Sequence, residues 1–168
     1  CFHDFTLKRI FKISKSIKYI NYADLKKIKN KNFQIPPLKE VLKISKKKFP
    51  IFIEIKPLFN KELLSNLIKE TRSFKKCTFI SFKHENIYNL LKLNSKLSVG
   101  LSFSNKSSIK SILKSSLNKK IKYLILDKKF LNSRRIQIIN KEKYYYTIKN
   151  KKEFLKYEKD NNLIFENL

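Results

Sequence analysis

Short apolar segments of strand character recur along the chain and alternate with segments whose apolar residues have helical spacing. The strands are expected at residues 51–56, 77–82, 97–103, 121–126, 143–148 and 162–166. They begin about 19 to 26 residues apart, which is the period of βα units with short loops. Because each segment is apolar on both faces, we expect a parallel sheet covered by helices. A (β/α)₈ barrel needs two more strands, so the predicted fold is an α/β TIM barrel, incomplete and lacking roughly the first two strands.

The segments between the strands predict the helices. Apolar side chains recur three and four positions apart in 38–47, 60–69, 84–93, 107–117 and 150–159. Residues 1–4 resemble the end of a strand, and 5–35 is Lys-rich and irregular apart from one short helical stretch at 22–28. We expect a single domain over 1–168.

The first full strand carries the candidate site. Strand side chains alternate, so Ile51, Ile53 and Ile55 share one face while Phe52, Glu54 and Lys56 share the other. Glu54 and Lys56 fall at the carboxyl end of the strand, where α/β barrels and open α/β sheets place their chemistry. A structural ion pair at a strand end is the alternative, and this stretch alone leaves it open.

The charge of the chain is strongly positive. Forty Lys and Arg against 13 Asp and Glu give a net charge of +27, which would ordinarily suggest a nucleic acid or an anionic membrane as partner. Lysine is, however, spread over every segment together with Ile, Asn, Phe and Tyr, as an A+T-rich coding sequence produces. Arginine, which suits bidentate contacts to bases, is scarce. We therefore expect no specific nucleic-acid partner.

Cysteine usage and hydropathy bear on the compartment. Cys1 and Cys77 are far apart and lack metal-ligand spacing, which fits a reduced compartment, and we expect a cytoplasmic protein. No apolar run approaches the length of a membrane span. The chain does not begin with Met, and strand-like sequence is already under way at Phe2, which suggests a missing upstream part.

Several segments, in this order, resemble the glycerophosphodiester phosphodiesterase family. The similar segments are 2–9 (FHDFTLKR), which resembles its H-D-x-T-L-x-R pattern, 22–26 (YADLK), 35–42 (IPPLKEVL), 53–56 (IEIK), 81–82 (SF), 146–150 (YTIKN) and 163–167 (LIFEN). Each is weak alone, but their order and spacing hold along essentially the whole chain.

The resemblance implies a TIM barrel with a small insertion, here at about 5–35, that cleaves glycerophosphodiesters to sn-glycerol 3-phosphate and an alcohol. By position, His3 would be one catalytic histidine and Glu54 a ligand of a divalent cation, Mg²⁺ or Ca²⁺. Lys56 would contact the substrate phosphate, and Tyr146 would line the substrate pocket. The residue chemistry agrees, because hard cations prefer carboxylate oxygens and histidine titrates near neutrality.

The sequence also departs from the family. The family's first histidine and its Glu-x-Asp metal pair belong to a segment that would precede His3, and His84 does not stand at the first histidine's position. We therefore expect a fragment that alone binds metal poorly and turns over little or nothing. A non-catalytic remnant of the barrel and a basic nucleic-acid-binding domain are the alternatives. The identity of the glycerophosphodiester and the oligomeric state are left open.

Overall fold

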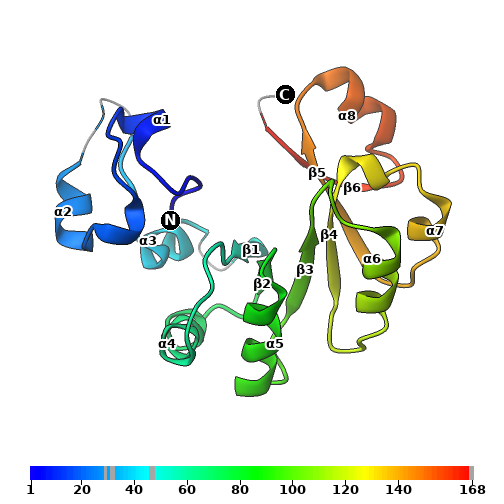
Figure 1. Ribbon diagram of the computed structural model, residues 1–168, viewed down its shortest axis with the longest axis horizontal. Helices are drawn as coiled ribbons and strands as arrows, with labels where there is room; N and C mark the ends of the chain where they lie inside the picture. Colours follow the sequence, from blue (N-terminus) through cyan, green and yellow to red (C-terminus); the bar gives the residue numbers. More distant parts are fainter. Residues whose placement is uncertain (29, 31–32, 46–47, 167–168) are drawn as a thin grey trace. The chain divides into compact units, whose positions relative to one another are not determined.

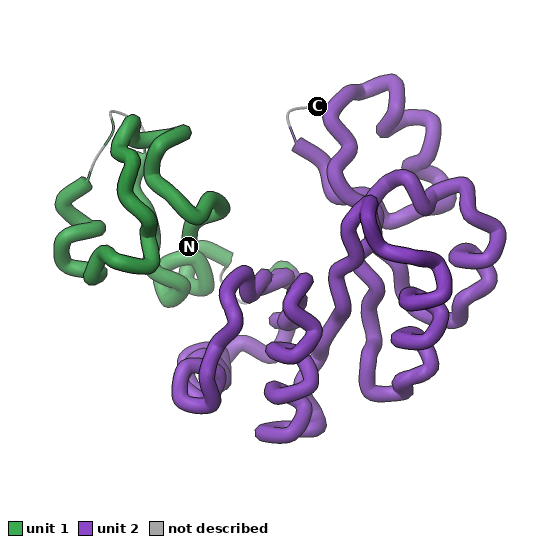
Figure 2. Tube along the Cα trace, viewed as in Figure 1, with its two compact units in different colours: residues 1–49 green, residues 50–168 purple. Residues whose placement is uncertain are grey.

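The computed structural model describes residues 1–28, 30, 33–45 and 48–166. The chain forms two compact units, residues 1–49 and residues 50–168, which Figure 2 distinguishes. Each unit is described by itself below. The expectation of a single domain with an insertion at about 5–35 stays a prediction.

The second unit is built on one parallel sheet whose strands follow chain order (Figure 1). The strands are β1 (Ile51–Glu54), β2 (Cys77–Ser81), β3 (Val99–Phe103), β4 (Tyr123–Asp127), β5 (Glu142–Ile148) and β6 (Asn162–Phe165). Every strand pairs in parallel with the next one. The six predicted strands are confirmed, with bounds that differ by at most two residues at either end.

The sheet is curled. Phe52 on β1 packs edge-on against Tyr123 on β4 and Tyr144 on β5, with ring centroids 5.6 and 4.8 Å apart. In a flat sheet β1 and β4 would be about 14 Å apart, because neighbouring strands are spaced by roughly 4.8 Å. The side chains therefore meet across the inside of a half-barrel, which confirms the α/β barrel-like fold. The absence of two further strands stays a prediction.

Helices connect the strands, and the positions of their apolar residues explain why they form. They are α4 (Lys61–Thr71), α5 (His84–Leu93), α6 (Ile109–Ser116), η2 (Lys128–Phe130), α7 (Arg134–Gln137) and α8 (Lys151–Tyr157). Asn60, Ser108 and Asn150 cap α4, α6 and α8 by accepting a hydrogen bond from a first-turn amide. In Figure 1, α5 lies along β2 and β3, and α4 lies beside α5. The segment between β4 and β5 contains η2 and α7.

Burial is not uniform across the sheet. All residues of β2 and β3 are buried, whereas every residue of β1 is half-buried. The expectation that the first strand is fully covered on both faces is therefore wrong, because β1 pairs with β2 alone and lies at the edge of the sheet.

The chain contains a single glycine, and the loops are formed by other residues. Helix caps come from Asn and Ser, and among the described residues Lys12 is the one non-glycine with positive φ. Gly100, the single glycine, lies within β3, where a Cβ would stand 2.9 Å from the Cβ of Tyr123 and 3.0 Å from its carbonyl oxygen. The one glycine is thus placed where two strands approach closely.

The first unit is a small helical assembly. It contains α1 (Lys8–Phe11), η1 (Ile17–Tyr19), α2 (Tyr22–Lys27) and α3 (Leu38–Ile44) around a core of Leu7, Leu25 and Ile35. The strand end expected at residues 1–4 is wrong, since these residues form bends and no strand, and the irregular stretch 5–35 holds short helices. Lys47, the end of the helix predicted at 38–47, lies outside the described residues.

Candidate functional site

Glu54 and Lys56 form an ion pair at the carboxyl end of β1. The Lys56 Nζ atom lies 2.8 Å from Oε2 and 2.9 Å from Oε1 of Glu54. Their side chains are 23% and 27% exposed, so the charges are partly withdrawn from water yet open to a ligand. Lys56 follows the end of β1 and keeps the side of the strand that the alternation predicts. The contact is compatible with both a site and the structural ion pair left open above.

A buried asparagine holds the loop that follows Lys56. Asn86, on α5, has no exposed surface. Its Oδ1 accepts a hydrogen bond from the Phe59 amide at 2.9 Å, and its Nδ2 donates to the Pro57 carbonyl at 2.8 Å. Asn86 was not among the predicted site residues, although its position in the sequence carries a signal. Asn86 stands four residues before Leu90 and so falls on the apolar face of the helix.

Ser81 joins the ends of β1 and β2. Its hydroxyl donates to the Ile55 carbonyl at 2.5 Å and accepts from the Lys83 amide at 3.0 Å. The Asn86 amide nitrogen lies 3.3 Å from the same oxygen. These contacts give the serine of the Ser-Phe motif a positioning role, because they fix the backbone between Glu54 and Lys56.

Tyr146 lies on the same edge of the sheet. Its hydroxyl donates to the Phe103 carbonyl at 2.9 Å, and its ring packs edge-on against Phe82 with centroids 5.8 Å apart. Burial raises the pKa of Tyr146 above its ordinary range, and the negative charges of Asp127 and Glu54 act in the same direction. Phe82, which is 43% exposed, joins Tyr146 in an aromatic wall beside the charged pair.

His84 and Asp127 have structural partners at this edge. The His84 Nε2 atom lies 3.0 Å from the Ser102 carbonyl, next to the carbonyl that Tyr146 binds. Asp127 accepts the Lys129 amide at 2.9 Å and so caps η2. Both residues fasten the ends of β3 and β4.

His3 belongs to the first unit. Its Nδ1 atom lies 2.8 Å from Asp4 Oδ1, while Arg9 Nε binds Asp4 Oδ2 at 2.6 Å and Arg9 Nη2 binds Oδ1 at 3.1 Å. The hydrogen bonds from Arg9 and then His3 lower the pKa of Asp4 to about 2. These two adjacent side chains can meet because residues 1–4 do not form a strand. The histidine side chain is 72% exposed.

Comparisons with known proteins identify the family and the fold. The sequence pattern of the glycerophosphoryl diester phosphodiesterase family matches residues 1–156. The chain belongs to this family. A comparison with curated protein sequences gives no match.

Solved phosphodiesterase structures share the fold. A phosphodiesterase from Oleispira antarctica, in complex with the product sn-glycerol-3-phosphate, has a TM-score of 0.79 at 21% identity, covering 98% of this chain and 73% of that one. A glycerophosphodiester phosphodiesterase from Parabacteroides distasonis has a TM-score of 0.71 at 18% identity, covering 98% and 71%. A putative glycerophosphodiester phosphodiesterase from Galdieria sulphuraria has a TM-score of 0.74 at 13% identity, covering 97% of this chain and 72% of that one.

A divalent cation is what this family would lead us to expect beside Glu54. Hard cations take six or more oxygen ligands. Among the described residues, however, no three His, Cys, Asp or Glu side chains gather into a possible metal site. Glu54 could supply one ligand, but its carboxylate is bound by Lys56, and the described residues bring no further carboxylate or imidazole groups together with it into a cation site.

The tyrosines of β5 predict a loss of stability in alkali. Burial raises the pKa of Tyr144 and of Tyr145 to about 12, from an ordinary value of 10.0. In the unfolded chain these groups ionise first, so unfolding releases protons and the free energy of unfolding falls as the pH rises from about 10 towards 12. Urea unfolding followed by circular dichroism across this interval measures the slope.

A pair of variants isolates this effect from the titration of the many lysines. Tyr145→Phe is expected to flatten the alkaline slope, whereas Tyr88→Phe, on the exposed side of α5, is expected to leave it unchanged. Equal slopes in the two variants would contradict the assignment to β5.

Proposed function

We propose that the chain acts on glycerophosphodiesters as a metal-dependent phosphodiester hydrolase, releasing sn-glycerol 3-phosphate and an alcohol. One observation carries the proposal: in a chain of this family, the Glu54–Lys56 pair lies at the carboxyl edge of the sheet. The negative charge of Glu54 contributes to the raised pKa of Tyr146, which supports a substrate pocket that Tyr146 shares with that pair. The sn-glycerol-3-phosphate bound by the Oleispira antarctica enzyme supports the substrate class.

Each residue has a proposed role. Lys56 binds the substrate phosphate as a point charge. Tyr146, with Phe82, flanks the glycerol moiety. Glu54 would be one oxygen ligand of a divalent cation, Mg²⁺ or Ca²⁺. The described residues do not supply the other ligands. Such a cation would withdraw electrons from a phosphoryl oxygen.

His3 is proposed to move the proton in the reaction. Hydrolysis forms a bond from a water oxygen to phosphorus and breaks the bond from phosphorus to the alcohol oxygen. The water loses a proton, and the departing oxygen gains one. The carboxylate of Asp4 binds Nδ1 of His3, which orients the imidazole and leaves its other nitrogen for the proton that the alcohol takes.

The compartment is also a proposal. Cys77 is a buried thiol whose pKa is raised by burial, and it lies in a different unit from Cys1. This arrangement supports a reducing compartment, for which we propose the cytoplasm. None of the described helices is long and apolar enough to cross a bilayer.

Two measurements on the purified chain test the function. The first is release of sn-glycerol 3-phosphate from glycerophosphocholine with Mg²⁺, with Ca²⁺ and with a chelator. The second is calorimetric binding of sn-glycerol 3-phosphate itself. We expect binding, and little turnover by this chain alone, because the described residues gather no metal cluster; the chelator should abolish what turnover there is. Binding with no turnover at all would replace the hydrolase by a non-catalytic relative. No binding would overturn the proposed site.

A further inference from the structure

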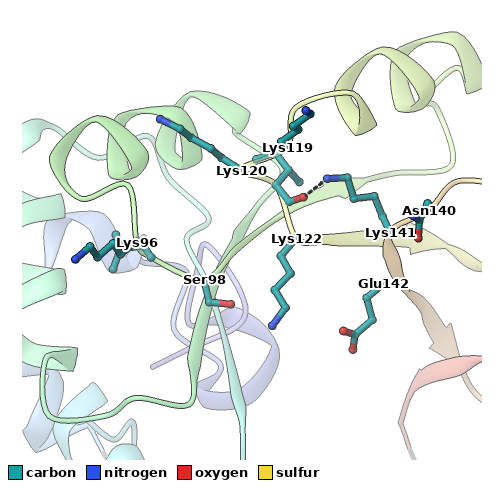
Figure 3. A pocket seen from close by; sticks show the side chains of 10 residues that line it. Lys96, Ser98, Lys119, Lys120, Lys122, Asn140, Lys141 and Glu142 are labelled. Carbon is teal, nitrogen blue, oxygen red and sulfur yellow. Dashed lines mark hydrogen bonds between the residues drawn. The ribbon is translucent and has the colours of Figure 1, made fainter.

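Lysines gather at the amino-terminal end of the sheet, opposite the edge that carries Glu54. A hollow of about 590 Å³ lies there, lined by the loops that lead into β3, β4 and β5. Figure 3 shows the side chains that line it. The lysines that line it are Lys96, Lys119, Lys120, Lys122 and Lys141. The one acidic residue lining this hollow is Glu142, whose Oε1 accepts the Tyr144 hydroxyl at 2.7 Å. The hollow is therefore strongly positive.

Two ammonium groups connect the loops around this hollow through hydrogen bonds. Lys141 Nζ donates to the Ile121 carbonyl at 2.7 Å and to the Asn118 carbonyl at 3.1 Å, which ties the loop before β5 to the loop before β4. Lys143 Nζ donates to the Ile139 carbonyl at 2.7 Å and to the Gln137 carbonyl at 3.2 Å. The segment after α7 is thus held against the sheet, so the surface is preorganised for binding.

An apolar groove of about 750 Å³ continues the hollow and shares Lys119, Asn140 and Lys141 with it. Leu117 and Ile138 line the groove and are 80% and 76% exposed, among the most exposed large apolar side chains described. Lys110 and Lys114 line the same groove. We call the two hollows together the basic face. It combines protruding aliphatic side chains with seven lysines.

The combination of aliphatic side chains and lysines distinguishes between two anionic partners, a single-stranded nucleic acid and a membrane. A single-stranded nucleic acid would be met by aromatic platforms and arginine forks. The exposed apolar side chains of the basic face are aliphatic instead, and its cations are lysines. Aliphatic side chains that enter the headgroup region, surrounded by lysines that meet anionic headgroups, are the features of a peripheral membrane surface. We propose that the basic face docks the chain on an anionic phospholipid bilayer.

Docking in this way leaves the candidate site open to water. The basic face covers the amino-terminal ends of β3 to β5, whereas Glu54 and Lys56 lie at the carboxyl end of the same parallel sheet. A water-soluble substrate can therefore reach the site while the chain is on the bilayer. The proposal concerns a different surface from the proposed hydrolase site, so either can fail without the other.

Vesicle sedimentation of the full chain tests the proposal. We expect binding to vesicles of phosphatidylcholine mixed with phosphatidylserine, no binding to pure phosphatidylcholine, and release at high salt. The triple variant Lys119→Glu, Lys120→Glu, Lys122→Glu should lower the partition coefficient at least about tenfold. The double variant Leu117→Ser, Ile138→Ser should lower it by about three- to tenfold.

Matched variants separate the basic face from the overall charge. Lys61→Glu, Lys69→Glu, Lys92→Glu changes the net charge equally on α4 and α5, and Leu63→Ser, Leu155→Ser removes two other exposed leucines. Both should retain binding to within about threefold. Equal losses in test and control variants would overturn the proposal. A single-stranded oligonucleotide that displaces the vesicles, and that the lysine triple variant no longer binds, would overturn it in favour of a nucleic-acid surface.

Discussion

Replacing Lys56 by methionine is expected to weaken the binding of sn-glycerol 3-phosphate by about 10- to 100-fold. The ammonium is the half-buried cation beside the aromatic wall, and methionine keeps most of its length without its charge. The substitution also leaves the Glu54 carboxylate without its ion-pair partner, so an anionic ligand meets an unopposed negative charge. Isothermal titration calorimetry of the purified chain, in the presence of a chelator, measures the affinity.

Glu54→Gln is expected to shift the same affinity in the opposite direction. Without a divalent cation, the carboxylate competes with the phosphate for Lys56, so its neutral isostere should strengthen binding by about two- to tenfold. Any dependence of binding on Mg²⁺ or Ca²⁺ should disappear, together with hydrolysis. This sign distinguishes a ligand site from a structural ion pair, for which neither variant would alter the affinity.

A lysine elsewhere provides the control. Lys92→Met removes one exposed ammonium from α5, away from the carboxyl edge, and should leave the affinity unchanged. If Lys92→Met and Lys56→Met weakened binding equally, the product would be held by the general positive charge of the chain rather than at the end of β1.

Replacing Asn86 by alanine is expected to lower the free energy of unfolding by about 2 to 4 kcal/mol. The variant leaves the Phe59 amide and the Pro57 carbonyl without their partner, and it removes a polar contact of the Ser81 hydroxyl. Buried groups left unpaired in this way cost more than an average hydrogen bond contributes. Urea unfolding at neutral pH measures the loss.

The effect of Asn86 should extend to the candidate site, because the loop that it holds begins one residue after Lys56. We expect Asn86→Ala to weaken sn-glycerol 3-phosphate binding by about three- to tenfold in the folded protein. Asn66→Ala on α4 is the matched control: this asparagine is exposed, so the change should stay within about 0.5 kcal/mol. A stability loss in both variants, or in neither, would refute the proposed role of Asn86 in holding this loop.

Much of the scaffold was predictable because its signals are local. The helix expected at 84–93 is α5, and the strands expected at 77–82 and 143–148 are β2 and β5, since periodic burial leaves a readable pattern. Edge strands were harder. The first strand looked fully buried because its residues are apolar, but apolar character does not tell how many neighbours a strand has.

The site was predictable in part. Alternation along β1 placed Glu54 and Lys56 on one side of the strand, and the structure shows their ion pair. Asn86 and Phe82 escaped because their roles depend on partners far along the chain: Asn86 binds Pro57, and Phe82 packs on Tyr146. His3 and Asp4 meet because their backbone is bent, which the residue types did not disclose.

Two kinds of property can now be distinguished in this chain. Residue order alone carried the period of the βα units, the parallel sheet and the family, because patterning and motifs are written in neighbouring residues. Folding was needed to bring Phe52 to Tyr123 and Tyr144 across a curled sheet, and to collect lysines from three loops beside Leu117 and Ile138. In the sequence, the scattered lysines were interpreted as compositional bias. In the folded chain, some of them form one basic surface, because the loops that precede parallel strands lie at the same edge of the sheet.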